Sequence, residues 1–566
     1  MKILEDIQSV DRRVFTAYMS ALGLGGTVFP GVLWAHMQAR GAITSDIVAD
    51  AGAVAGLDFT DAEREVMLAD LNMNLEAYEA LREVSVSNQV PPAVQFDPAL
   101  PGRDLPSQTR PFRTTRHIGL QRPADPETLA FMPVTQLSEL IRTRQLSSTE
   151  LTTLYLERLE RHGPTLEAVI TLMSDRALEH AARADGEIAS GAYRGSLHGI
   201  PWGAKDLLAA EGFRTTWGAT PYQDQVIGED ATVVRRLEEA GAILVAKLTL
   251  GALAQGDYWY GGRTRNPWNL EQGSSGSSAG SAATTAAGLV GFAIGSETLG
   301  SIVSPSTRCG VTGLRPTYGR VSRSGSMALS WSMDKLGPMA RSVEDCALVF
   351  NAIHGEDGRD PTTRTAPFNW DSERPLSDLR VGYFRRGFEA ERATGHDRAA
   401  LETLRSLGVE PRPIDLPFGY PLGALRIILR AEAAAAFDEL TLSGRDDLLV
   451  RQTPGSWPNS FRVARMIPAV EYIQANRVRT MLMGALEAAL EGIDVFITPT
   501  RAPDVSLMTN LTGHPAVVVP SGFNDDGTPV SVVFIGQLWA DAEMLRVAKA
   551  WQDATDFHTQ RPPLFG

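Results

Sequence analysis

Cysteine and long apolar runs are scarce in this chain of 566 residues, and its charge is strongly one-sided. The two cysteines, Cys309 and Cys346, are too few for a disulfide framework or a metal cluster built on cysteine. No apolar run reaches the roughly 18 residues of a membrane-spanning helix, so we expect no membrane span. The formal net charge is −14 and no run of Lys and Arg resembles a nucleic-acid footprint, so nucleic acid is not an expected partner.

Metal- and nucleotide-binding motifs are also absent from the sequence. It contains no HExxH pair, no cluster of Cys and His and no phosphate-binding glycine loop, so we expect neither a metal nor another cofactor. Lysine is rare, since only five of the 53 basic residues are lysines. One of them, Lys205, lies in GIPWGAKDLL. A buried lysine can lose its proton whereas an arginine cannot, so this choice of residue invites a chemical explanation.

The first 97 residues are expected to form a helical extension. Within them, Arg12 and Arg13 precede a mildly apolar stretch that resembles a twin-arginine export signal. Acidic residues before the arginines, an internal Tyr and Pro, and a poor cleavage site favour a retained amphipathic segment instead. We therefore expect a cytoplasmic protein, with export as the open alternative.

Residues 43–97 carry apolar side chains at helical spacing in two blocks. The break between the blocks reads GLDFTDAERE, in which Thr60 is a candidate N-cap and Glu63 completes a capping box. We expect a helical hairpin followed by an extended, proline-containing tail. The segment resembles the small C subunit of the tRNA-dependent amidotransferases, which wraps around a catalytic A subunit. A generic helical cap is the alternative interpretation.

Residues 98–127 are a linker rich in Pro and Arg, and from 128 to 566 helices alternate with apolar strands. DVFITPT and PVSVVFIGQ predict buried strands, and DAEMLRVAKAWQDAT predicts a closing helix. This alternation predicts an α/β domain around a mixed sheet. We expect the stretch of about 360–470 to be a helical insertion that could cover the site.

Three stretches of this domain carry candidate chemistry. They read GIPWGAKDLL (199–208), NPWNLEQGSSGSSAGSAATTAAG (266–288) and GSETLGSIVSP (295–305). Together with CGVTGLRPTYGRVSRSG further on, they resemble the amidase signature family, which includes the A subunit of the tRNA-dependent amidotransferases and fatty acid amide hydrolase. The resemblance spans roughly 128–560. It implies a central mixed, twisted β-sheet covered by helices.

This resemblance implies a Ser–Ser–Lys set of catalytic residues. Ser301, in the loop GSETLGSI, matches the nucleophile, and Lys205 matches the base. The family's bridging serine lies 24 residues before the nucleophile and follows a glycine, which selects Ser277. Ser274 is the other candidate, because GSSG at 273–276 looks more like the usual motif. In the family the peptide bond of the bridging serine is cis.

In this arrangement Lys205, kept neutral by burial, accepts the proton of Ser301 through Ser277. Ser278 is expected to support this relay by hydrogen bonding. The developing oxyanion would be held by the backbone N–H of Ser301 and of the three residues before it. Those three residues are Thr298, Leu299 and Gly300.

The nucleophile loop departs from the family pattern at three positions. Glu297 replaces an Asp, Leu299 a Gly, and Val303 an Arg. Leucine restricts a backbone that glycine leaves free, which bears on the direction of its N–H. The missing arginine could be replaced beside Glu297 by Arg308 or Arg315. None of these changes removes a catalytic group, so they bear on substrate preference.

Several residues have competing interpretations. GSSAG also fits G-x-S-x-G with Ser278 as nucleophile, but that elbow needs a preceding strand, and NPWNLEQ is expected to form none. His514 is expected to pack rather than act as a base, and Asp334 and Arg341 to form a structural ion pair. The aromatic residues of GDYWYGG fit a substrate wall and an ordinary core equally well; they are Tyr258, Trp259 and Tyr260.

The expected activity is hydrolysis of a small-molecule carboxylic amide. Attack by the serine forms an acyl-enzyme and releases ammonia or an amine, and water then cleaves the ester. Carbamates and aryl esters undergo the same acyl transfer. The alternative is an A-type subunit of a tRNA-dependent amidotransferase that supplies ammonia to a partner. The sequence leaves the oligomeric state open, and a homodimer is one possible assembly.

Overall fold

The computed structural model describes residues 43–102, 105–391 and 393–566. The candidate export segment around Arg12 and Arg13 lies outside these residues. Within the described part of the chain, no helix is both long enough and apolar enough to cross a membrane.

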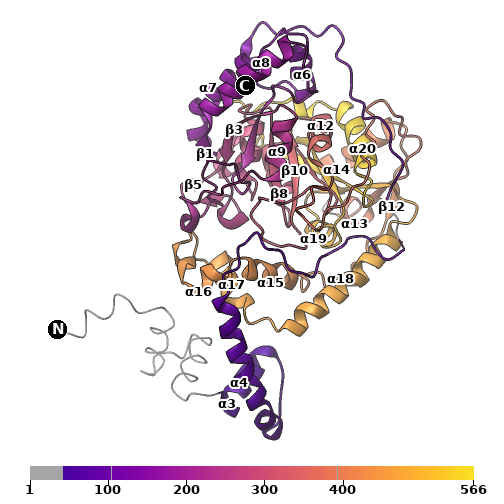
Figure 1. Ribbon diagram of the computed structural model, residues 1–566. Coiled ribbons are helices and arrows are strands. Elements are labelled where there is room, and N and C mark those ends of the chain that lie inside the picture. Colours follow the sequence, from indigo (N-terminus) through magenta and orange to yellow (C-terminus); the bar gives the residue numbers. More distant parts are fainter. Residues whose placement is uncertain (1–42, 103–104, 392) are drawn as a thin grey trace, which may run out of the picture.

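An 11-stranded mixed sheet organises most of the chain (Figure 1). Its strands are β1 (Val169–Leu172), β2 (Pro201–Lys205), β3 (Ile243–Leu248), β8 (Phe292–Glu297), β9 (Thr312–Arg315), β10 (Lys335–Ala340), β11 (Val381–Phe384), β12 (Arg412–Ile414), β13 (Val495–Pro499), β14 (Ala516–Phe523) and β15 (Pro529–Gly536). Their order is β1-β3-β2-β8-β10-β9-β14-β15-β13-β11-β12. The pairs β3-β2-β8 and β13-β11-β12 are parallel, whereas the pairs between them and the edge pair of β1 with β3 are antiparallel, so the predicted mixed sheet is confirmed.

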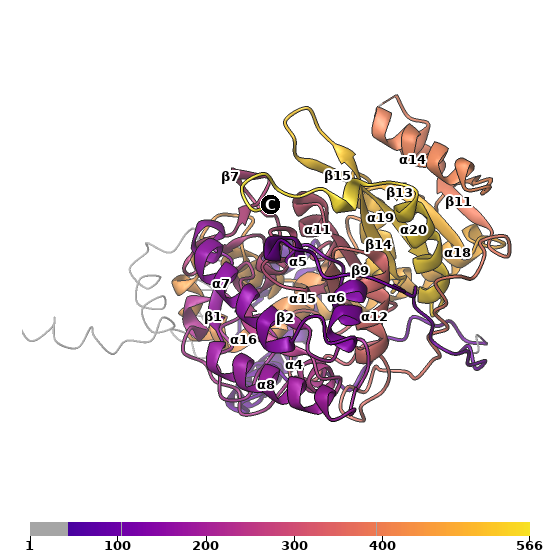
Figure 2. The same ribbon diagram turned by 90° about the horizontal axis from the view of Figure 1, so that it is seen from above.

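Helices cover both faces of this sheet. One set comprises α7 (Ser148–Leu166), α8 (Ser174–Ala189), α10 (Ala279–Ala286) and α11 (Val303–Cys309), and the other α6 (Val134–Arg142), α9 (Thr232–Glu239), α12 (Val343–Ile353) and α20 (Asp541–Asp553). Because strand side chains alternate between faces, Phe292 and Ile294 of β8 enter one core and Ala293 the other. Seen from above, α7 and α8 lie at one end of the molecule and β11 at the other (Figure 2).

The stretch from 360 to 470 is not purely helical, contrary to the prediction. β11 and β12 add two parallel strands to the sheet edge, and they are too short to show a clear strand period in the sequence. The helices that follow are α15 (Arg426–Ala436), α16 (Asp438–Leu442) and α17 (Trp457–Ala464). With α18 (Ala469–Ala489) they form a layer below the sheet in Figure 1.

The extension begins with the two expected helices, α3 (Ser45–Ala55) and α4 (Asp61–Glu83). The predicted capping box at the start of α4 is confirmed. The backbone N–H of Thr60 donates to Glu63 Oε2 at 2.7 Å, and the N–H of Glu63 donates to Thr60 Oγ1 at 3.3 Å. This reciprocal pair satisfies N–H groups that the first helical turn leaves without partners.

After α4 the chain runs as an extended tail between the sheet and the α15–α18 layer (Figure 1). The ring of Phe96 meets Tyr318 edge-on, with centroids 5.0 Å apart. The guanidinium of Arg479, from α18, lies 3.5 Å from the centroid of the Phe96 ring. The tail is therefore in contact with both layers of the molecule.

Phe96→Ala should lower the free energy of unfolding by about 2 kcal/mol, somewhat less than for a fully buried aromatic because Phe96 is half-buried. Urea unfolding of the full chain measures this change. Val94→Ala is the matched control, since Val94 is 87% exposed and its truncation should cost less than about 0.5 kcal/mol. Equal effects of the two substitutions would contradict a packed tail.

Candidate active site

Two neighbouring strands inside the sheet bring the candidate residues together where the strands end. Lys205 is the last residue of β2, and Ser301 lies in the turn that follows β8. β2 and β8 are parallel, with Ala204 opposite Ile294, so both strands end on the same side. Ser277 lies in the loop before α10, which packs against both strands. Three stretches distant in sequence therefore meet here.

The amine of Lys205 lies among serine hydroxyls. Its Nζ is 2.8 Å from Ser277 Oγ, 3.0 Å from Ser278 Oγ and 2.9 Å from Ser296 Oγ. All four side chains are buried. Sequence reasoning missed Ser296, although it lies near the end of β8, the strand that pairs with β2 beside the lysine.

Burial sets the protonation of this amine. It lowers the pKa of Lys205 well below its ordinary value, and the carboxylates of Asp334 and Glu297 oppose that shift without cancelling it. Neutral hydroxyls solvate a lysine less well than water does, so the uncharged amine is favoured. Such an amine can accept a proton, as a general base must.

Of the two candidate bridging serines, Ser277 is the one in contact with the lysine. The peptide bond between Gly276 and Ser277 is cis, as the resemblance implied. Ser274 is also buried, but its hydroxyl donates to the carbonyl of Ser275 at 2.9 Å.

Ser278 ties the two serine loops together. Its N–H donates to the carbonyl of Ser301 at 3.1 Å, and its hydroxyl donates to the carbonyl of Ser296 at 3.0 Å. The expectation that no strand precedes it was wrong, because β7 (Asn269–Gly273) pairs with β6 (Arg265–Asn266). This hairpin is separate from the central sheet, and Ser278 is fully buried, so the nucleophile-elbow geometry is absent.

The backbone after β8 presents a row of N–H groups. In the described part of the chain, no hydrogen bond occupies the N–H groups of residues 298–301. Gly300 takes the positive φ of this turn, at 80°, while Leu299 keeps a negative φ. The leucine therefore fits without the freedom of glycine. Donors arranged in this way suit an oxygen that becomes negative during a reaction.

Glu297 holds the turn in place. Its Oε2 accepts the N–H groups of residues 302–303 at 2.8 and 3.0 Å, and its Oε1 accepts from Arg315 at 2.8 Å and from Asn510 at 2.9 Å. Burial alone would raise the pKa of Glu297, but Arg315 and these hydrogen bonds lower it to about 2. Of the two candidate replacements for the missing arginine, Arg315 pairs with Glu297, whereas Arg308 bonds to Gln272.

Two further expectations have opposite outcomes. The predicted pair of Asp334 and Arg341 is wrong, because Asp334 Oδ1 accepts the hydroxyl of Thr298 at 2.5 Å and Arg341 donates to backbone carbonyls. His514 packs, as predicted. It is buried 2.8 Å from the Thr512 hydroxyl, and burial together with a nearby arginine lowers the pKa of His514 to about 3.

The three aromatic residues lie in and just after a short strand, β4 (Tyr258–Trp259). Tyr258 is 38% exposed, and the guanidinium groups of Arg263 and Arg451 lie 5.0 and 5.2 Å from its ring centroid. Trp259 borders a surface hollow beside α7 and β1 and meets Tyr260 edge-on. Among the described residues, no hydrogen bond or ring contact joins these aromatics to the lysine–serine cluster.

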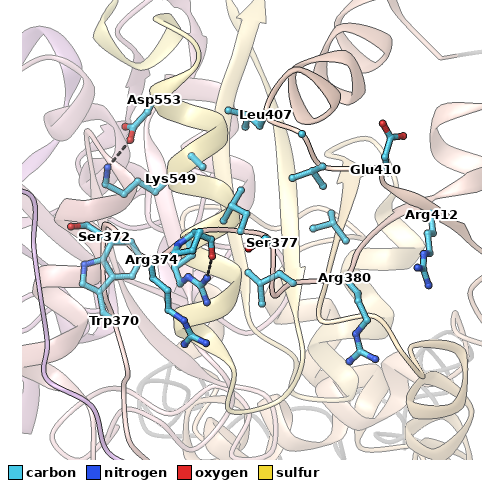
Figure 3. Close-up of a pocket in the computed structure, with 18 residues that line it drawn as sticks. Trp370, Ser372, Arg374, Ser377, Arg380, Leu407, Glu410, Arg412, Lys549 and Asp553 are labelled. Atoms are coloured by element: carbon cyan, nitrogen blue, oxygen red, sulfur yellow. Dashed lines mark hydrogen bonds and ion pairs between the residues drawn. The ribbon is translucent and has the colours of Figure 1, made fainter.

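One cavity lies away from this cluster. It measures about 650 Å³ and is lined by residues of α20 and of the starts of β11 and β12 (Figure 3). Two of its cations have acidic partners: Arg380 pairs with Asp494 at 2.8 Å, and Lys549 with Asp553 at 2.6 Å. A second cavity of about 390 Å³ reaches Asp334, which supports the N–H turn through Thr298.

A buried lysine is hydrogen-bonded to serine hydroxyls, and the neighbouring turn after β8 presents N–H groups without acceptors. Together these features define an acyl-transfer centre of the serine type. A sequence profile of the family described as Amidase matches residues 150–505. The chain belongs to the amidase family, whose enzymes act on the carbon–nitrogen bonds of amides.

Individual relatives agree with this assignment. The A subunit of the glutamyl-tRNA(Gln) amidotransferase of Moorella thermoacetica is 36% identical over 484 residues, covering 77% of this chain and 99% of that protein. The native peptide amidase of Stenotrophomonas maltophilia is 33% identical, with a TM-score of 0.68 over 78% of this chain and 100% of its own. The corresponding A subunit of Thermotoga maritima is 28% identical, with a TM-score of 0.62 over 76% and 96%.

Glu297→Gln should lower the free energy of unfolding by about 3 kcal/mol at pH 7, because it leaves the buried Arg315 without its counter-charge. The pKa of Glu297 is about 2 when folded and roughly 4.3 when unfolded, so the stabilisation is present above about pH 4.3. It is lost as the pH falls toward 2.

Urea unfolding between pH 3 and 7 checks this pH dependence. The difference in the free energy of unfolding between wild type and Glu297→Gln should become smaller toward acid pH. Glu410→Gln, at an exposed position, should leave stability close to wild type throughout. If the loss of stability in Glu297→Gln did not change with pH, that result would contradict a lowered pKa for Glu297.

Proposed function

We propose that this protein is a stand-alone amide hydrolase in which Lys205, Ser277 and Ser301 act as base, relay and nucleophile. The observation that carries the proposal is the fully buried lysine amine 2.8 Å from the hydroxyl of Ser277. The turn that holds Ser301 follows the strand beside that lysine and offers N–H groups without other acceptors.

The proton moves along this relay. The hydroxyl of Ser301 gives its proton to Ser277 as Ser277 gives its own proton to neutral Lys205. The Ser301 oxygen bonds the carbonyl carbon of the amide, and the π electrons move onto the carbonyl oxygen. The N–H groups of residues 298–301 stabilise that oxyanion. As the carbonyl re-forms, the C–N bond breaks, and the relay returns the proton to the departing nitrogen.

The acyl-enzyme is then an ester on Ser301. Water attacks it, giving its proton to the same relay, and the free acid leaves with the serine restored. The same sequence accommodates carbamates and aryl esters, because only the leaving group changes. The substrate is a small-molecule amide, and a homodimer is compatible with this chemistry.

The second candidate function is an A-type amidotransferase subunit that passes ammonia to a partner. It is supported by the relatives from Moorella and Thermotoga, which carry that name. The helices α3 and α4 and the tail after them, which we propose to be a fused equivalent of the C subunit, also support it. The likeness to a peptide amidase favours the free hydrolase.

Turnover by the purified chain alone separates the two functions. We expect it to release ammonia from at least one of benzamide, hexanamide and glutamine. Glutamate dehydrogenase detects the ammonia released from benzamide and hexanamide. Hydrolysis of glutamine is followed by the glutamate that it forms. A fluorophosphonate probe should label wild type at Ser301, located by peptide mass spectrometry, and should not label Ser301→Ala. Labelling without turnover on any amide would favour the partner-dependent subunit, and absence of both would contradict an activated serine.

Ser277→Ala should reduce turnover by about 10²–10⁴-fold, the usual contribution of a positioned proton-transfer group. Ser274→Ala is the matched control, because it removes a buried hydroxyl that does not contact the lysine, and it should retain most activity. Lys205→Met should behave like Ser277→Ala. Both effects appear in kcat with the thermal transition little changed. The reverse pattern for the two serines would show that the assignment of the bridging serine is wrong.

A further inference from the structure

A turn of the N-terminal extension lies against the loop beneath the proposed oxyanion hole. The carbonyl of Ser87 accepts the N–H of Val90 at 3.0 Å, which closes the turn and puts Asn88 and Gln89 at its tip. Both side chains are half-buried. This turn lies well outside residues 150–505, the part of the chain that the family profile matches.

Asn88 pairs with a backbone residue of the catalytic part through both ends of its carboxamide. Its Oδ1 accepts the N–H of Ala328 at 2.8 Å, and its Nδ2 donates to the carbonyl of Ala328 at 2.9 Å. The same Nδ2 lies 3.2 Å from the carbonyl of Ala436, at the end of α15. Beside it, Gln89 Nε2 donates to the carbonyl of Ser326 at 3.0 Å. A carboxamide offers a donor and an acceptor side by side, as this pairing requires.

The loop that Asn88 holds is folded around Asp334. Asp334 Oδ2 accepts the N–H groups of Leu329 and Ser330 at 2.8 and 2.9 Å. Its Oδ1 accepts the hydroxyl of Thr298, the first residue of the N–H row. The buried carboxylate of Asp334 therefore links the loop to Thr298, so a shift of the loop is passed on to Thr298.

Other contacts hold this loop on either side of Ala328. Upstream, the N–H of Met327 donates to the carbonyl of Leu207 at 3.0 Å. Downstream, Glu432 of α15 accepts from both the backbone and the hydroxyl of Ser332. Between these anchors, both backbone groups of Ala328 are bonded to Asn88. The same loop and the same turn line the cavity of about 390 Å³ that reaches Asp334.

We propose that Asn88 is a positioning residue for the oxyanion hole. It fixes Ala328, which keeps the loop closed on Asp334, which in turn sets the place of Thr298 and of the N–H groups that follow it. The extension is then part of the reaction centre and more than a stabilising cap. This inference rests on the proposed function, because it assigns a task within the same acyl transfer.

Asn88→Ala should reduce kcat by about 10–100-fold, the loss expected when groups at a reaction centre are misplaced by about 1 Å. KM should change by less than about threefold, because the oxyanion forms only after the substrate is bound. The rate of labelling by the fluorophosphonate should fall in parallel with kcat, since that reaction also places negative charge on oxygen in the hole. Kinetics use whichever of benzamide, hexanamide and glutamine the wild type hydrolyses.

Two further variants separate positioning from folding. Gln95→Ala is the matched control, because Gln95 is an exposed amide of the same tail whose Nε2 bonds only locally, to Pro92. It should leave kcat at the wild-type value. Asn88→Asp keeps an acceptor for the N–H of Ala328 but loses the donor for its carbonyl. It should recover part of the kcat lost in Asn88→Ala.

Hydrogen exchange provides a readout that does not depend on turnover. In Asn88→Ala, amides of the peptide covering residues 296–303 should exchange at least threefold faster than in wild type, while α20 should be unchanged. The inference is overturned if that peptide and the labelling rate both match wild type, or if Gln95→Ala shows the same losses. If the fluorophosphonate did not label the wild type, that result would contradict the proposed function. The comparison of hydrogen exchange in wild type and Asn88→Ala would still decide whether Asn88 orders the turn.

Discussion

The rest of the site depends on one buried amine. A lysine without water or a counter-ion tends to lose its proton, and Lys205 is enclosed by hydroxyls at the end of β2. Two carboxylates, those of Asp334 and Glu297, are near enough to favour the charged form. Each of them is occupied elsewhere, by the hydroxyl of Thr298 and by the guanidinium of Arg315. Because these partners hold the carboxylates in place, neither acid is paired with the amine, and its basicity remains available for chemistry.

The two carboxylates also shape the turn that carries the proposed nucleophile. Glu297 accepts the N–H groups that follow Ser301, and Asp334 holds the hydroxyl three residues before it. The N–H groups between those two anchors are the ones without protein acceptors. Fixed dipoles of this kind stabilise developing charge without reorganising at the moment of reaction. Asp334 and Glu297 therefore act on two features at once: they favour the charged form of Lys205, against the effect of burial, and they hold the turn of the proposed oxyanion hole.

The N-terminal extension lies outside residues 150–505, the part of the chain that the family profile matches, and is in contact with that part. Its tail passes between the sheet and the α15–α18 layer, where Phe96 contacts both and Asn88 bonds to the loop around Asp334. Under the proposal that the extension is a fused equivalent of the amidotransferase C subunit, its counterpart there is a separate polypeptide. In this chain the covalent link keeps the tail at high local concentration, so the contacts persist without an assembly step. The segment thereby couples stability of the fold to order at the reaction centre.

The sequence by itself indicated the family and the mixed α/β architecture, because motif spacing and strand periodicity are local properties of the chain. Its resemblance to that family also pointed to Lys205, Ser277 and Ser301 as candidate catalytic residues. The sequence also predicted the capping box at Thr60 and limited the replacement arginine to Arg308 or Arg315, of which the structure places Arg315 beside Glu297. Only the tertiary structure decided that Ser296 adjoins the lysine, that Asp334 serves Thr298 rather than Arg341, and that β11 and β12 extend the sheet. These facts depend on strand register and on contacts between separate segments of the chain: Ser296 lies 91 residues after Lys205, and Asp334 lies 36 residues after Thr298. No local pattern of residues encodes them, since each is settled by how separately formed elements pack.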